Sequence, residues 1–392
     1  MTQTPAASTQ VRTPAPAQAA PPGRGVRALR AVAIASCLPY ITLKVVWIAG
    51  GRIGVPDGST LLEHRTMMAV VNSVSVLLDG AVVVLALLLT QSWGRRVPAW
   101  LIGLPMWAAT GLLAPIMTGY PLQLAGSLVD GSRPAPSNSE PFLATWVFAV
   151  VYSGFILQGL TLGTLFVLYA RRRWGHLWRG SLGDAGTTRA CFESSVVHPK
   201  GGAHGVRCVR SQGGGSALWM DRPYSGDSDN AASVRARRPE PDGTFTTRPR
   251  AARATAAAGA VLALLPAVMH LLWATGATTG LSADRIAERS TDFHLVEGVH
   301  TLFAVVAVVG TSLLVLRLRA AARLSTKIPL AGAWVGSGTL GCWGGFLFLT
   351  TLMPTDPDQR AAGPMVLTYA VSMVAGFLLL SGVVSVLRRR AA

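Results

Sequence analysis

The sequence predicts an all-α, polytopic membrane protein in which eight transmembrane helices form two parallel four-helix repeats. Half of the 392 residues are hydrophobic and only 14% are charged, whereas soluble domains carry about 25% charged residues. The charges lie between long apolar runs, and a run of about 18 apolar residues is long enough to cross a bilayer. In addition, segments of the first half recur in the second half, which is the pattern left by duplication.

The apolar runs and the basic joints between them define the expected topology. The eight runs cover about residues 28–49, 67–90, 98–118, 143–169, 254–276, 296–316, 328–352 and 365–387. Basic residues gather in alternate joints, as at Arg95–Arg96 and Arg388–Arg390. Because loops rich in Lys and Arg stay in the cytoplasm, we expect a multi-pass protein of the cytoplasmic membrane with both termini inside. The net charge of +17 belongs to these loops, so we predict no nucleic-acid partner.

Two polar segments lie outside the spans. Residues 1–26 are rich in Pro, Ala and Thr, and residues 171–253 are rich in Gly, Ser, Arg, Asp and Pro. Neither can bury enough apolar surface to fold, so we expect a disordered tail and a disordered cytoplasmic linker. Within the linker, residues 189–222 differ in composition from their surroundings, and both a native insertion and a reading-frame artefact stay open. The repeats are then residues 27–170 and 254–392.

The first span of each predicted repeat contains the same short motif. LPYITLKVVWIAGG in the first half matches LPAVMHLLWATG in the second, and PFLATW at the start of span four matches PMVLTY at the start of span eight. An ionisable residue precedes a tryptophan by three positions in both motifs: Lys44 before Trp47, and His270 before Trp273. Because each repeat has an even number of spans, both should have the same orientation, as in parallel-repeat transporters.

Composition and the first span also carry a resemblance. Only three of the 35 basic residues are lysine, and the first span reads LPYITLKVVWIAGG. In these features the chain resembles multi-pass integral membrane proteins of actinobacteria to which no activity is assigned. The resemblance implies a membrane location and no particular chemistry.

Glycines recur along span seven at Gly332, Gly336, Gly341 and Gly345. Small residues at such spacings let helix backbones approach closely within a membrane. We therefore expect these glycines to pack helices together and not to form a ligand site.

In the first repeat the ionisable candidates are Asp79 and Lys44. Charged groups inside a bilayer are costly and mark function by default, and Asp79 lies near the middle of span two. It is either a proton or substrate site or a structural partner of Lys44. Lys44 can itself reach the interface with its long side chain, or it can pair with Asp79. Gln158 in span four is a further polar group at mid-depth.

In the second repeat, span six carries His294, Glu297 and His300 at steps of three, on one helix face. We expect Glu297 and His300 to share an outward-open polar cavity with His270. A metal held by His294, Glu297 and His300 is an alternative, but Glu-x-x-His metal bundles need carboxylates from other helices. The matching position of span two offers only Asn72, opposite His300. A third reading is hydrogen bonding between helices without a ligand, and no cofactor is predicted.

These features favour a transporter or permease for a small solute, with proton coupling through Asp79 and Glu297 as one form of it. The alternatives are a membrane-bound metal or haem redox protein or enzyme that uses the cluster of span six, and a scaffold or regulatory protein that acts through its cytoplasmic loop. No hydrolase, zinc-protease, dinucleotide or kinase motif occurs in the sequence, which favours a protein without enzymatic activity. The expected partners are the lipid bilayer and a small solute.

Overall fold

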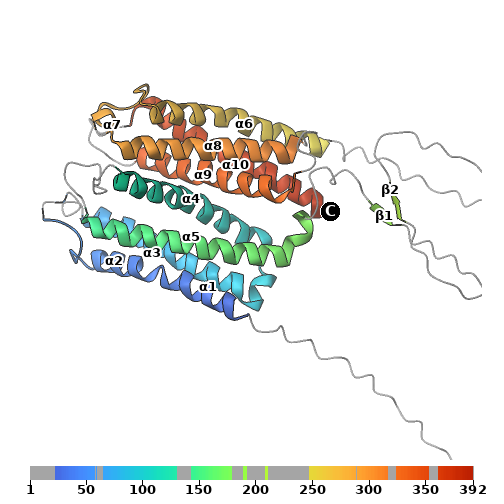
Figure 1. The fold of residues 1–392 in the computed structure, drawn as a ribbon, viewed down its shortest axis with the longest axis horizontal. Helices are drawn as coiled ribbons and strands as arrows, with labels where there is room; N and C mark the ends of the chain where they lie inside the picture. The colour runs from blue at the N-terminus through green and yellow to red at the C-terminus, as the bar shows by residue number, and fades with distance from the viewer. Residues whose placement is uncertain are drawn as a thin grey trace, which may run out of the picture. The chain divides into compact units, whose positions relative to one another are not determined.

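A computed structural model of the chain describes residues 23–57, 59, 65–129, 143–178, 189–191, 208–210, 247–287, 289–316, 324–352 and 361–391 (Figure 1). Most of the predicted tail and linker, and most of residues 189–222, lie outside this set. Within it the chain is all-helical apart from one antiparallel ladder of β1 (Arg189–Cys191) and β2 (Cys208–Arg210). The predicted all-α class is confirmed.

Contacts divide the chain into two compact units. Unit 1 comprises Met1–Met106 and Phe142–Arg173, and unit 2 comprises Trp107–Pro141 and Trp174–Ala392. The long helix α4 (Ala99–Val129) therefore begins in unit 1 and ends in unit 2. The repeats expected at residues 27–170 and 254–392 are a different division of the chain and stay a prediction.

Unit 1 is built from the helices of the first half. They are α1 (Arg24–Ala35), α2 (Leu38–Ile48), α3 (Arg65–Thr90), the 3-10 helix η2 (Ser92–Arg96) and most of α5 (Thr145–Trp174). Helix α3 packs against both α1 and α2. A buried apolar cluster joins α2 and the loop after it to the start of α5, and it consists of Leu43, Trp47, Val55, Leu143 and Val147.

The first predicted span, residues 28–49, corresponds to a candidate membrane span, although its helix is interrupted between α1 and α2. Helix α1 ends at Ala35, and Pro39 lies in the first turn of α2. Proline has no N–H, and its ring clashes with the carbonyl four residues earlier, which here belongs to Ala35. The hydroxyl of Ser36 at the break donates to the Ala33 carbonyl at 2.9 Å. The two helices together still form one candidate span, Arg24–Ile48.

Unit 2 is a bundle of four long helices, α6 (Thr247–Ala274), α8 (Thr291–Leu316), α9 (Lys327–Thr351) and α10 (Gly363–Ala391). Helix α8 packs on α6 and α9, and α10 packs on the same two helices (Figure 1). The short helices η3 (Gly175–Trp178) and α7 (Ala283–Ala287) complete the unit. The centre of the bundle is lined by small and aliphatic side chains: Ala263, Ala304, Ala307, Leu340, Ala375 and Leu379.

Glycines of α9 bring helix backbones into direct contact. A β-carbon added to Gly376 of α10 would strike the backbone of Gly341, and one added to Gly336 would lie 2.6 Å from the Ala307 backbone nitrogen. Neighbouring backbone cannot move aside as a flexible side chain can. The prediction that the glycines of span seven pack helices together is confirmed at these positions.

Helix α4 is longer than the predicted span of residues 98–118, because it continues to Val129. Gly119 and Pro121 lie inside it, and they would end many helices in water. In membrane helices both residue types are tolerated. The part of α4 that belongs to unit 2 begins at Trp107 and contacts α9, where the Trp107 indole N–H donates to the Ser337 hydroxyl at 3.1 Å.

Seven helical segments are long and apolar enough to cross a membrane. They also expose large apolar side chains, such as Leu77, which is 73% exposed. Lipid is the solvent that suits such a surface, so the chain is a multi-pass membrane protein. The remaining predicted span, the seventh at residues 328–352, corresponds to α9, which has 25 residues but does not count among these seven helical segments. It contains six glycines together with serine and threonine.

Candidate functional site

Three ionisable side chains converge in unit 2, one from α6 and two from α8. Glu297 and His300 lie three positions apart on one face of α8, and His270 lies near the end of α6, which packs against α8. Nδ1 of His270 is hydrogen-bonded to Oε2 of Glu297. The ring centroids of His270 and His300 are 4.9 Å apart. The structure thus brings together the three residues that the sequence predicts to lie close to one another.

This cluster can hold a ligand. One ligand atom from each of His270, Glu297 and His300 lies within 4.8 Å of the other two. His270 and Glu297 are 4% and 7% exposed, and Nδ1 of His300 is buried with no hydrogen-bond partner among the described residues. A buried polar atom without a partner costs about 1–3 kcal/mol, so the cluster has unused bonding capacity.

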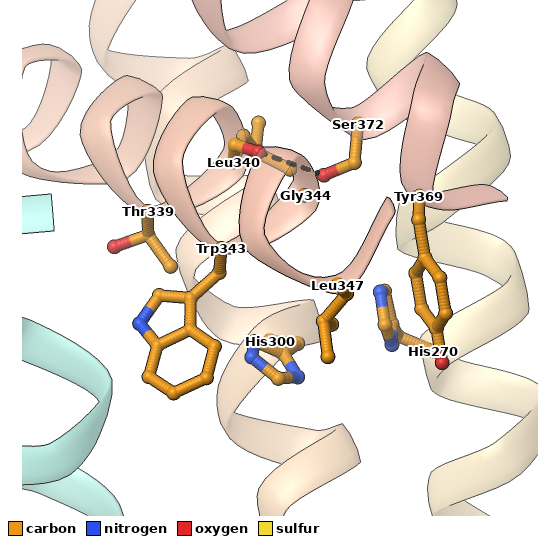
Figure 2. Close-up of a pocket in the computed structure, with 9 residues that line it drawn as sticks. All are labelled: His270, His300, Thr339, Leu340, Trp343, Gly344, Leu347, Tyr369 and Ser372. Carbon is orange, nitrogen blue, oxygen red and sulfur yellow. Dashed lines mark hydrogen bonds between the residues drawn. The ribbon is translucent and has the colours of Figure 1, made fainter. Parts of the chain in front are cut away.

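A cavity borders the two histidines. Its volume is about 10 Å³, counted as space open to the centre of a water-sized sphere, which is about the space of one water molecule. Figure 2 shows the imidazoles of His270 and His300 beside it, with Tyr369 near the first and Trp343 near the second. Sites for organic ligands are usually about 300–1,000 Å³. The cavity in this state therefore suits a water molecule or a single ion.

His294 lies outside this cluster. Its Nδ1 is 2.9 Å from the carbonyl oxygen of Trp273, so it connects the start of α8 to the end of α6. The ligand set that converges contains His270 in place of His294. Sequence spacing showed which residues share a face of α8, but only the packing of α6 on α8 shows which histidine is close to Glu297.

The segments after Trp47 and Trp273 fold alike. The indole N–H of each tryptophan donates to the carbonyl six residues later, at 2.8 Å in the first segment and 2.9 Å in the second. Glycines with φ between 74° and 97° follow each tryptophan by three and seven residues, namely Gly50, Gly54, Gly276 and Gly280. These positive φ values favour glycine. Lys44 and His270 thus occupy the same position before the same turn.

In unit 1 the candidates gather around Asp79 of α3. Asp79 is 5% exposed, and its Oδ1 accepts a hydrogen bond from the Gln158 side-chain amide at 3.5 Å. Its Oδ2 is buried and has no hydrogen-bond partner in the described part of the chain. In the sequence only its depth marks Gln158 as a candidate, and the structure shows that it contacts Asp79.

Lys44 does not pair with Asp79 in this structure. Its Nζ lies 4.8 Å from the ring centroid of Tyr40 and 4.9 Å from that of Trp47. Such cation–π contacts stabilise a cation by about 0.5–2 kcal/mol, depending on its exposure. The ammonium is thus held by aromatic rings one helical turn to either side.

Asn72, the last of the predicted candidates, lies on the same helix as Asp79. Asn72 is buried on α3 at 4% exposure, seven residues before Asp79 and therefore on the same helix face. Sequence reasoning did not place Tyr369 and Trp343 at the histidines. The match of PMVLTY to PFLATW was the one signal that pointed to Tyr369, and nothing distinguished Trp343 from the other tryptophans.

Comparison with protein-family models, curated proteins and solved structures gives no match to this chain. Evidence for a function therefore comes from the chemistry of these side chains.

Proposed function

We propose that this chain is a secondary transporter whose solute is a small divalent cation bound by His270, Glu297 and His300. The observation that carries the proposal is the convergence of two imidazoles and one carboxylate inside a bundle of membrane helices. Ionisable residues in that position mark ion pathways by default. The cation is the transported solute in this proposal, and no resident cofactor is invoked.

The donor set and the cavity narrow the class of solute. Imidazole and carboxylate ligands suit zinc and other first-row divalent ions, whereas calcium and magnesium prefer oxygen ligands alone. A cavity of about 10 Å³ has no room for haem or an organic solute in this state. From the sequence, a metal held by His294, Glu297 and His300 is only an alternative, whereas the proposal assigns the cation to His270, Glu297 and His300.

The number of protein ligands favours reversible binding and release of the cation over permanent binding. Structural zinc sites are closed by four protein ligands, whereas sites with three protein ligands keep a position open. Here three residues converge, four to nine residues from the ends of their helices. At 1.5 Å per residue, this places the site about 6–14 Å from those ends. A bound ion would therefore have a short path to one side of the membrane.

The two similar turns support the predicted duplication. Each has the same tryptophan hydrogen bond and the same two positive-φ glycines, and each follows a helix that carries the ionisable residue in the same place. In the proposal α9 also crosses the membrane, which makes eight spans in all, and two four-span repeats have the same orientation. In the first half the ammonium group of Lys44 then occupies the position at which the second half has a cation ligand, His270.

The number of spans decides on which side the C-terminus lies. With eight spans, a fluorescent reporter that matures only in the cytoplasm should fluoresce when fused to either terminus. Seven spans would place the termini on opposite sides, so only one of the two fusions would fluoresce. That result would show that α9 does not cross the bilayer and would contradict the parallel four-span repeats.

Transport is tested with purified protein in liposomes that contain a zinc-sensitive dye. We expect saturable Zn²⁺ entry above that of protein-free liposomes, and loss of this entry in His300→Ala. His294→Ala is the matched control, because His294 is on the same helix but outside the cluster. Zn²⁺ binding without entry would overturn transport and favour a membrane enzyme, since catalytic zinc also has three protein ligands and an open position.

A further inference from the structure

The carboxyl group of Asp79 is buried among membrane helices with half of its bonding capacity unused. Asp79 lies 14 residues after the start of α3, a helix of 26 residues. Each of these positions is about 1.5 Å along the axis, so the carboxyl group is about 17–21 Å from either end of the helix. A side chain as short as aspartate cannot reach the interface from this depth.

The contacts of Asp79 suit a neutral carboxyl group better than a carboxylate. Its Oδ1 accepts one long hydrogen bond from the neutral amide of Gln158, at 3.5 Å, and Oδ2 has no hydrogen-bond partner in the described ranges. An isolated carboxylate in an apolar medium is far more costly than a neutral polar group, and such a group neutralises instead. One amide donor is too little to stabilise a full negative charge.

The groups that face Asp79 come from α2 and α5. From α2 and its N-cap, the titratable side chains within electrostatic reach are Cys37, Tyr40 and Lys44. From α5 the facing polar group is Gln158. Lys44 is the one cation among these groups, and its ammonium contacts the rings of Tyr40 and Trp47 and makes no ion pair with Asp79. A flexible lysine stem could bring that ammonium toward Asp79 once the carboxyl group loses its proton.

We infer that Asp79 is a proton-binding site, protonated in the state described here, and that its proton is the coupling ion of the transporter. Binding forms one O–H bond on the carboxylate, and release breaks that bond and returns one proton to water. In the released state the carboxylate has Lys44 as its available counter-ion. The coupling part of this inference rests on the proposed transport, whereas proton binding by Asp79 does not.

Infrared difference spectroscopy tests directly whether the carboxyl group of Asp79 carries a proton. In liposomes at neutral pH, the wild-type protein should show the C=O stretch of a buried, protonated carboxyl group, and Asp79→Asn should lack it. Asp57→Asn is the control, because Asp57 is an exposed loop residue, and it should keep the band. Asp79→Glu should restore a band at a shifted frequency. Identical spectra for the wild type and Asp79→Asn would overturn the inference.

Transport measurements test whether proton binding by Asp79 is coupled to the movement of Zn²⁺. Asp79→Asn should still bind Co²⁺ at the histidine cluster and exchange Zn²⁺ across the membrane at equal pH, but an imposed pH gradient should no longer drive Zn²⁺ accumulation. Gradient-driven accumulation at the wild-type level in Asp79→Asn would overturn the coupling. If the wild-type protein binds no cation at all, the proposed function fails, and the infrared result alone decides whether Asp79 binds a proton.

Discussion

Replacing His300 by alanine is expected to reduce the affinity for Co²⁺ by at least about 100-fold, since losing even an outer-shell partner of a metal ligand costs about 10–100-fold. The variant loses one of three ligands, and in the native structure the Nδ1 atom of His300 has no competing hydrogen-bond partner among the described residues. Co²⁺ is a suitable probe because its visible absorption reports imidazole coordination. Titration of the detergent-purified protein gives the affinity and the spectrum together.

Two further variants separate the ligand set from neighbouring residues. Glu297→Gln keeps the shape of the side chain but removes the anionic ligand, so it should weaken Co²⁺ binding as His300→Ala does. His294→Ala should leave the affinity unchanged, because its imidazole contacts the Trp273 carbonyl. If His294→Ala weakens binding and His300→Ala does not, the ligand set predicted from sequence spacing is correct and the cluster with His270 is not the site.

Ligand-induced stabilisation provides an independent readout. A ligand that binds only the native state adds about 2.7 kcal/mol at a concentration 100 times its dissociation constant. Co²⁺ should therefore raise the melting temperature of the wild type and of His294→Ala, but not that of His300→Ala. An equal rise in all three proteins would indicate binding elsewhere on the chain.

The helices were predictable from the sequence because each apolar run is a local signal. Length and hydrophobicity are sufficient to locate a membrane span, so all eight predicted runs correspond to helical segments. The differences between the predicted spans and the observed helices have local physical causes as well. Pro39 interrupts the first span, and the glycine and proline near residue 120 do not end α4, because membrane helices tolerate both.

The partners of the ionisable residues were less predictable, because they depend on how helices pack. The sequence offered Lys44 as the counter-ion of Asp79, since opposite charges in a membrane favour pairing. In the structure Lys44 contacts two aromatic rings of its own helix, and Asp79 contacts Gln158 of α5. Sequence spacing defines which residues share a helix face, but not which faces of different helices meet.

Replacing Gly376 by alanine is expected to lower the free energy of unfolding of the bundle by about 1–3 kcal/mol, the usual cost of overpacking a core. The added β-carbon would strike the backbone of Gly341 and lie 2.7 Å from the Ser337 carbonyl oxygen. Because these are backbone atoms, α10 must move away from α9 as a whole. Tyr369 lies on α10 two turns before Gly376, so this movement should also weaken Co²⁺ binding.

The matched control is Gly119→Ala, another glycine inside a helix of unit 2. A β-carbon at Gly119 would meet nothing within 4 Å, and alanine is a better helix former than glycine by about 1 kcal/mol. Thermal unfolding in detergent should therefore show a lower melting temperature for Gly376→Ala and an equal or higher one for Gly119→Ala. If both variants melt at the wild-type temperature, close backbone contact between α9 and α10 is not what holds the bundle together, and the position of Tyr369 beside His270 must depend on other contacts.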